Sequence, residues 1–262
     1  YEQAGKYFAA GISFLHKNKW NQQYSLSLEL HEMSAVACFM AGHLEAVPSR
    51  INDILSNAKS FDDTLNSQVL MAKYLASQEQ YASATEGVLS ILSHLGEFFP
   101  SDINESQLGK EIKASQAILK DITKEKVLRI ASMTDSNKLK AMKFMTLLHS
   151  FSNFASPLLA HLLSCRMIQL TFESGFCENS ILGLGFISHS LWHYSDDIQL
   201  ASQVGRIAEA LIHEHRNEHS LRARVTQSTL SHKCIVDPFQ ATCDYCQIGS
   251  NSARIVGDED NA

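Results

Sequence analysis

The stretch LMAKYLASQEQYASATEGVLSILSHLGEFFP, residues 70–100, decides the fold class. It predicts two short helices separated by a polar break at 77–80. Gly96 predicts the end of the second helix, and Pro100 prevents its continuation. A helical hairpin of this kind cannot bury its apolar face alone, so the stretch predicts an array of similar hairpins. The apolar face of the second helix follows steps of three and four residues: Tyr81, Ala84, Val88, Ile91, Leu92 and Leu95.

A similar outline occurs about 37 residues earlier, where AVACFMAGHLEA (35–46) places a Gly42–His43 turn between two expected helices. Leu44 there corresponds to Tyr81 in the later copy. Two imperfect copies at this spacing are typical of degenerate tetratricopeptide hairpins. We therefore expect an all-α fold, built as a right-handed superhelix of antiparallel helix pairs, that is, a tetratricopeptide-like α-solenoid.

The rest of the chain continues the helical pattern. We expect helical hairpins in 1–100, a polar connector with an exposed helix in 101–135, and a second, truncated set of hairpins in 136–262. Asp135, and either Asp196 or Asp197, are the expected helix N-caps. The best strand candidate, Ile235–Val236, is too short to form a sheet. The expected helices cover 1–15, 24–41, 44–58, 70–76, 81–95, 105–119, 137–151, 157–172, 178–193, 198–215, 220–230 and 239–248.

Composition excludes several classes of function. The chain has 22 Lys and Arg against 28 Asp and Glu, and its net charge of -6 gives no basic stripe for nucleic acid. No apolar run reaches the length of a membrane span, and residues 1–6 show no signal-peptide pattern. Six cysteines are too few for a disulfide scaffold, which favours a reducing, cytoplasmic setting. The first residue is not Met, and 257–262 resembles a helix start, so we expect a segment of a longer chain.

The sharpest chemical cluster is formed by His232, Cys234, Cys243 and Cys246. The last two have CxxC spacing, and both residue types of this cluster, His and Cys, are common zinc ligands. However, the segment 239–248 is expected to be helical, whereas zinc knuckles usually close CxxC in a turn that contains Gly. Whether the four bind zinc or are ordinary side chains is left open, and we assign no metal, cofactor or catalytic residue.

A second cluster, IHEHRNEH, holds His213, His215 and His219 near an expected helix end. His215 and His219 could share a metal, but imidazoles also interact favourably with a helix C-terminus. The Gly183-Leu184-Gly185 segment follows no strand, so close helix packing explains it better than a nucleotide loop. Ser188 and His189 are adjacent in sequence, and adjacent side chains diverge on a helix, so no nucleophile–base pair is expected.

Several short segments resemble a family of very large signalling proteins. In that family a predicted AAA-type ATPase precedes a long helical repeat region, and sensor or histidine-kinase output domains often follow. The resemblance is carried by AGHLEA (41–46), LSHLGEFFP (92–100), GFCENSI (175–181) and GDEDNA (257–262). It implies a non-catalytic helical module that mediates protein–protein contacts and couples the ATPase to output domains. No Walker motif lies in these residues, so nucleotide hydrolysis is expected elsewhere in the parent chain.

Two alternatives belong to other classes. The chain could be a stand-alone tetratricopeptide-like scaffold that binds peptides, with no ATPase in the same protein. It could also be a metal-dependent helical hydrolase that uses the histidines of 213–219 and the cysteines of 234–246. The leading expectation has protein partners or neighbouring domains and involves neither nucleic acid nor a membrane.

Overall fold

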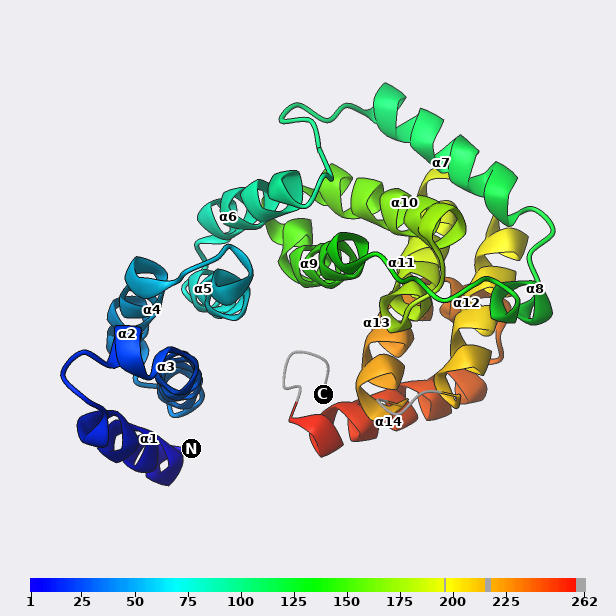
Figure 1. The fold of residues 1–262 in the computed structure, drawn as a ribbon. Coiled ribbons are helices and arrows are strands. Elements are labelled where there is room, and N and C mark those ends of the chain that lie inside the picture. Colours follow the sequence, from blue (N-terminus) through cyan, green and yellow to red (C-terminus); the bar gives the residue numbers. More distant parts are fainter. Residues whose placement is uncertain (196, 215–217, 258–262) are drawn as a thin grey trace. The chain divides into compact units, whose positions relative to one another are not determined.

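The chain is described by a computed structural model of residues 1–195, 197–214 and 218–257 (Figure 1). Every regular element in these ranges is a helix, which confirms the all-α prediction, and the only β-type contact among them is a bridge between Ser132 and Phe176. The chain divides into two compact units, 1–91 and 92–262. The elements of 1–94 are α1 (Glu2–Phe14), α2 (Lys19–Gln22), α3 (Tyr24–Met40), η1 (Leu44–Ala46), α4 (Val47–Asn57), η2 (Asp62–Thr64), α5 (Leu65–Ser77) and α6 (Tyr81–His94).

In the first unit, the long helices α1, α3, α4 and α5 pack in the order of the chain. Helix α3 contacts α1 before it and both α4 and α5 after it. Small residues allow the close approach of α1, because a Cβ on Gly11 would lie 3.4 Å from the Leu30 side chain of α3. The core between α3, α4 and α5 consists of Ala35, Cys38, Val47, Ile51 and Leu70, with Phe39, Ala46, Met71 and Tyr74 packed against it.

Two glycines end helices of the expected hairpins in the same manner: Gly42 follows α3, the first helix of its hairpin, and Gly96 follows α6, the second helix of the next. Gly42 has φ of +78°, and the N–H of His43 donates to the carbonyl of Cys38 at 3.0 Å. Gly96 has φ of +86°, and the N–H of Glu97 donates to the carbonyl of Leu92 at 2.9 Å. Both are left-handed helix terminations that glycine favours, so the predicted stops at Gly42 and Gly96 are confirmed.

The second unit continues with α7 (Glu105–Leu119) and α8 (Lys124–Leu128). The predicted bounds of α7 are confirmed, but the helix is exposed on one face only. Its buried side chains recur at steps of three and four, and the helix packs on α10 and α11 (Figure 1). Glu105, Lys110 and Lys113 are exposed, while Glu111 is partly buried and accepts from Gln169 of α10. The polar composition therefore concealed a narrow buried stripe: Leu108, Ile112, Ser115 and Leu119.

Six helices between Ser136 and Val256 complete the described part of the second unit. Each packs on the next, and α11 also packs on α13. Asp135 caps α9 by accepting from the N–H groups of Asn137 and Lys138, and Asp197 caps α12 by accepting from that of Leu200, as predicted. Asp196 lies outside the described residues. The helices are α9 (Ser136–Ala155), α10 (Pro157–Ser174), α11 (Glu178–Ser195), α12 (Ile198–Ile212), α13 (Glu218–Val236) and α14 (Phe239–Val256).

Two late helices are longer than the sequence predicted. The strand candidate Ile235–Val236 forms the last residues of α13, and α14 continues to Val256, where Gly257 ends it with φ of +68°. The terminal GDEDNA segment was expected to start a helix, but 258–262 lie outside the described residues. In none of the described helices is there a stretch long and apolar enough to cross a membrane.

Helix α13 is surrounded by close contacts with glycines of three other helices. A Cβ on Gly185 of α11 would lie 2.7 Å from the Ser228 hydroxyl, and one on Gly249 of α14 would lie 2.6 Å from a Thr226 methyl. A Cβ on Gly205 of α12 would lie 3.0 Å from the His232 ring. A Cβ on Gly183 would lie 3.2 Å from the Met167 side chain of α10, so both glycines of the Gly183–Gly185 pair lie at close helix contacts, as the packing interpretation predicts.

Candidate functional site

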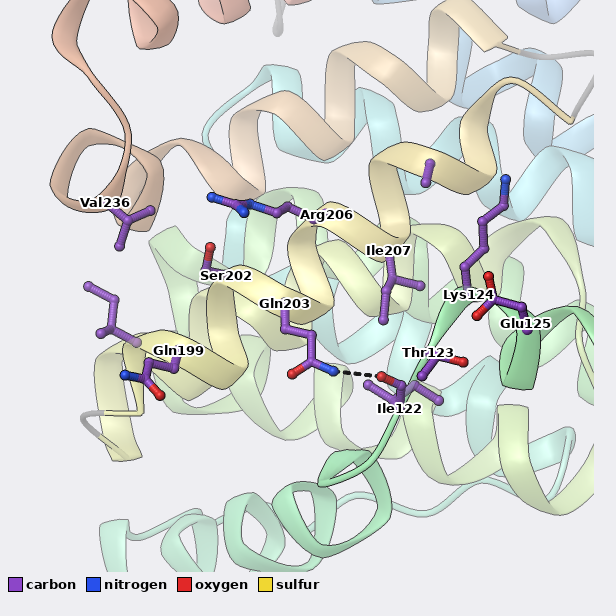
Figure 2. A pocket seen from close by; sticks show the side chains of 12 residues that line it. Ile122, Thr123, Lys124, Glu125, Gln199, Ser202, Gln203, Arg206, Ile207 and Val236 are labelled. Atoms are coloured by element: carbon purple, nitrogen blue, oxygen red, sulfur yellow. Dashed lines mark hydrogen bonds between the residues drawn. The ribbon is translucent and has the colours of Figure 1, made fainter.

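The candidate binding site is a hollow of about 570 Å³ in the second unit, shown in Figure 2. It lies between α12 and the segment that enters α8, and it reaches the end of α13. Thr123 sets the start of α8 because its hydroxyl accepts from the N–H of Lys126. We call this hollow the α12 groove. It is lined by Ile122, Thr123, Lys124, Glu125, Ile198, Gln199, Ser202, Gln203, Arg206, Ile207, Ala210 and Val236.

The α12 groove has an apolar wall and a few polar side chains above it. Ile122 and Ile207 are buried, and Val236 at the end of α13 is partly exposed. Gln203 reaches across the groove, where its side-chain N–H donates to the carbonyl of Ile122 at 2.6 Å (Figure 2). This bond fixes the loop before α8 against α12. Ser202 and Gln199 add further polar groups, so the lining combines an apolar wall with a few hydrogen-bonding side chains.

Ion pairs flank both ends of the α12 groove. Lys124 Nζ lies 2.7 Å from Glu214 Oε1, and Arg206 Nη2 lies 3.1 Å from Asp237 Oδ1. Burial opposes ionisation of Asp237, but hydrogen bonds from Lys233 and Arg206 outweigh it and lower the pKa of this carboxyl group. Lys124 and Arg206 are therefore already paired, and Glu125 is a further acidic side chain of the lining. Few charges of the groove are left to a ligand, which favours a ligand with few charges.

The four candidate zinc ligands do not form one site, although Cys234, Cys243 and Cys246 lie near one another. His232 is buried beside Gly205 of α12, whereas Cys234 is exposed. Two residues along a helix place these side chains on different faces of α13. Cys243 is exposed and Cys246 is partly buried on α14; burial raises the pKa of Cys246, and the nearby Cys234 and Cys243 raise it further. Among the described residues, no three His, Cys, Asp or Glu side chains are placed to hold a metal ion.

The second histidine cluster makes ordinary polar contacts where it is described. His213 Nδ1 lies 2.9 Å from Glu218 Oε1, and His219 Nδ1 lies 3.4 Å from the Ser252 hydroxyl. His215 lies outside the described residues, so its expected pairing with His219 is not tested. The hydroxyl of Ser188 donates to the carbonyl of Gly185, one helical turn earlier, at 2.6 Å.

A different group of histidines, which the sequence analysis missed, lies inside the second unit. His161 of α10 is buried, and its Nδ1 lies 2.9 Å from the Ser190 hydroxyl of α11. Its ring centroid lies 5.7 Å from that of His189 and 5.7 Å from that of the exposed His193. His149 of α9 stacks on an aromatic ring of α11 at 3.6 Å. Only the i, i+4 spacing of 189 and 193 hinted at this group.

Burial favours the neutral form of four histidine rings: His149, His161, His189 and His232. It lowers the pKa of His161 to about 3 and that of His232 to about 4, with neighbouring His189 adding to the shift in both rings. Burial also lowers the pKa of His149 and of His189. The Nδ1 atoms of His189 and His232 are buried with no hydrogen-bond partner in the described chain. Protonation of this group would therefore place unpaired charge inside the helices.

A buried ion-pair cluster fixes the turn that follows Gly96. Glu97 is 3% exposed, and its carboxylate lies 2.5 Å from Lys138 Nζ of α9 and 2.6 Å from Arg166 Nε of α10. Burial opposes ionisation of Glu97, but the hydrogen bonds from these two cations outweigh it and lower its pKa. The cluster joins segments that are 69 residues apart in sequence, and its role is structural.

Comparison with protein-family models, curated proteins and solved structures finds no match to this chain.

Proposed function

We propose that this chain is a non-catalytic helical-repeat module that binds protein partners. In the fuller form of the proposal, it belongs to a large signalling protein with an AAA-type ATPase and couples that ATPase to output domains. The setting is cytoplasmic, which six free thiols favour.

The observation that carries the proposal is the packing of α3. This helix contacts α4, its partner in the hairpin, and also α1 and α5, the helices before and after that hairpin. Contacts with the hairpin partner and with the next hairpin are the pattern by which helical repeats stack. Such stacking favours a right-handed superhelix of tetratricopeptide-like pairs, and these arrays generally act by presenting binding surfaces.

The α12 groove is the proposed contact site for a neighbouring domain or partner in the second unit. Its apolar wall, the Ser202 and Gln199 side chains and its paired charges fit a peptide segment with few charges. The parent ATPase is supported by the resemblance of 41–46, 92–100 and 175–181 to the helical region of such signalling proteins.

The coding sequence upstream of Tyr1 provides the first test. The proposal expects a GxxxxGK[ST] motif after a strand, followed by this helical region. If the upstream sequence encodes no ATPase, the coupling role is wrong and a stand-alone scaffold remains.

The second test measures coupling in the parent protein. Ser202→Trp would fill the α12 groove, because Ser202 lines it and is partly buried. We expect this variant to change the dependence of ATP hydrolysis on the output domain. Ser106→Trp places the same side chain at an exposed position of α7 and serves as the matched control. Equal hydrolysis by wild type and both variants would contradict a role for the groove.

A further inference from the structure

Helix α3 carries an exposed apolar stripe. Its four large side chains are 41–47% exposed, and they recur at steps of seven, three and four residues along one face of the helix: Leu26, Met33, Val36 and Met40. The stripe spans 15 residues, and its first and last Cα atoms are about 21 Å apart along the axis at the rise of an α-helix. Isolated exposed apolar residues are common, but a continuous row of this length indicates a contact surface.

The position of the stripe in the first unit makes it an accessible face with neighbours on each side. Helix α1 packs on α3 beside the stripe, where Gly11 meets Leu30. Helix α5 lies on the other side, where the Asn66 side chain donates to Glu32 at 3.4 Å. The opposite face of α3 is buried against α4 in the core. The stripe is therefore an exposed face of α3 with α1 on one side and α5 on the other.

The charges of α3 are of one sign. Glu29, which is exposed, and Glu32 are the only Asp, Glu, Lys or Arg residues between Tyr24 and Met40. Glu29 lies within the stripe by helical spacing, three residues after Leu26. Burial raises the pKa of Glu32, and the negative charges of Asp63 and Glu29 raise it further. A cation placed beside these carboxylates would relieve this repulsion.

We propose that the α3 stripe is the docking face for a cationic amphipathic helix of a partner protein. The partner lays its apolar side chains on Leu26, Met33, Val36 and Met40 and places Lys or Arg beside Glu29 and Glu32. Methionine suits this role because its flexible thioether adapts to different apolar surfaces. A second copy of this chain fits less well, since a symmetric contact would bring the same carboxylates together. This inference depends on the proposed function as a binding module.

The test uses the full chain and a fluorescent helical peptide of about 18 residues, long enough to cover the stripe. The peptide carries Leu at i, i+3, i+4 and i+7 with Lys between them, and a second peptide replaces every Lys with Glu. Fluorescence anisotropy measures binding at low and high salt. We expect the Lys peptide to bind and the Glu peptide not to bind, and we expect salt to weaken the binding.

Three variants locate the site. Met33→Ser should weaken binding of the Lys peptide about tenfold, the usual effect of truncating a central apolar contact. Glu29→Lys should weaken it as well and should allow the Glu peptide to bind. Leu55→Ser alters an equally apolar residue that is 36% exposed on α4, outside the stripe, and should leave binding unchanged. Circular dichroism confirms that each variant is folded.

Equal binding of both peptides, or equal losses from Met33→Ser and Leu55→Ser, would overturn the inference. Sedimentation that shows self-association abolished by Met33→Ser would assign the stripe to a second copy instead. These outcomes are distinct from failure of the proposed function, because the coupling test uses the α12 groove in the other unit.

Discussion

Acidification should destabilise the second unit through its buried histidines. A histidine in the unfolded chain has a pKa of about 6.5, whereas His161 and His232 in the folded unit have pKa values of about 3 and about 4. Between these limits the unfolded chain binds protons that the folded unit does not. The free energy of unfolding is therefore fully present above pH of about 6.5 and decreases as the pH falls below it.

The magnitude follows from the same values. At pH of about 5, each of the two rings costs about 2 kcal/mol relative to neutral pH, since one pKa unit corresponds to about 1.36 kcal/mol. Together His161 and His232 account for about 4 kcal/mol, a large part of the stability of an ordinary domain. Carboxyl groups titrate mostly below this pH, so the range from 7.5 to 5 separates the histidines from them.

The assay is urea unfolding followed by tryptophan fluorescence. The two tryptophans, Trp20 and Trp192, lie in different compact units, so Trp20→Phe leaves Trp192 as the reporter of the second unit. His161→Gln should remove about 2 kcal/mol of the pH dependence. Ser190→Ala removes the hydroxyl beside His161 but keeps the titrating ring, so its pH dependence should match that of wild type. A free energy of unfolding that is equal at pH 7.5 and 5, or an unchanged slope in His161→Gln, would refute the reasoning.

Two further predictions use the same Trp192 fluorescence measurement. Gly175→Ala should lower the free energy of unfolding by about 3 kcal/mol, because Gly175 has φ of +113° and an added Cβ would lie 2.7 Å from the Ala131 carbonyl oxygen. Gly109→Ala is the control: it changes an open helical position and should raise the free energy of unfolding by up to about 1 kcal/mol. Similar losses in both variants would contradict this account. Glu97→Gln should cost about 3 kcal/mol, because it removes the buried carboxylate that pairs with the partly buried Lys138 and Arg166. Glu173→Gln removes the exposed partner of the same Arg166 and should cost less than about 1 kcal/mol. A Glu97→Gln protein as stable as wild type would show that the cluster is dispensable.

Local structure was predictable where a single residue decides it. The bounds of α7, the cap at Asp135 and the stops at Gly42 and Gly96 depend on side chains within one helical turn, and the sequence alone identifies them. The length of α13 was underestimated: the prediction ended this helix at 230 and named Ile235–Val236 as the best strand candidate, because β-branched residues favour strands. The helix instead continues through this exposed pair to Val236.

The candidate sites depend on contacts between distant residues, which periodicity does not encode. The α12 groove exists because Gln203 reaches Ile122, 81 residues away in sequence. A helical pattern shows that one face of α10 is buried but does not show that His161 meets His189 there. The α3 stripe was missed for a related reason, since α3 has apolar residues on both faces and lacks a clear polar side.

The glycine contacts around α13 determine how this part of the molecule can move. A helix that advances by one residue rises about 1.5 Å and turns about 100°. In the structure, Thr226 packs on Gly249 and Ser228 packs on Gly185. Such a step would move these side chains away from the glycines and against residues that have a Cβ, where they would clash. Because side chains of α13 fit against glycines on three neighbouring helices, α13 resists both sliding along its axis and rotation about it. Mechanical force applied at α14 should therefore be transmitted to α11 by concerted displacement rather than absorbed by slippage.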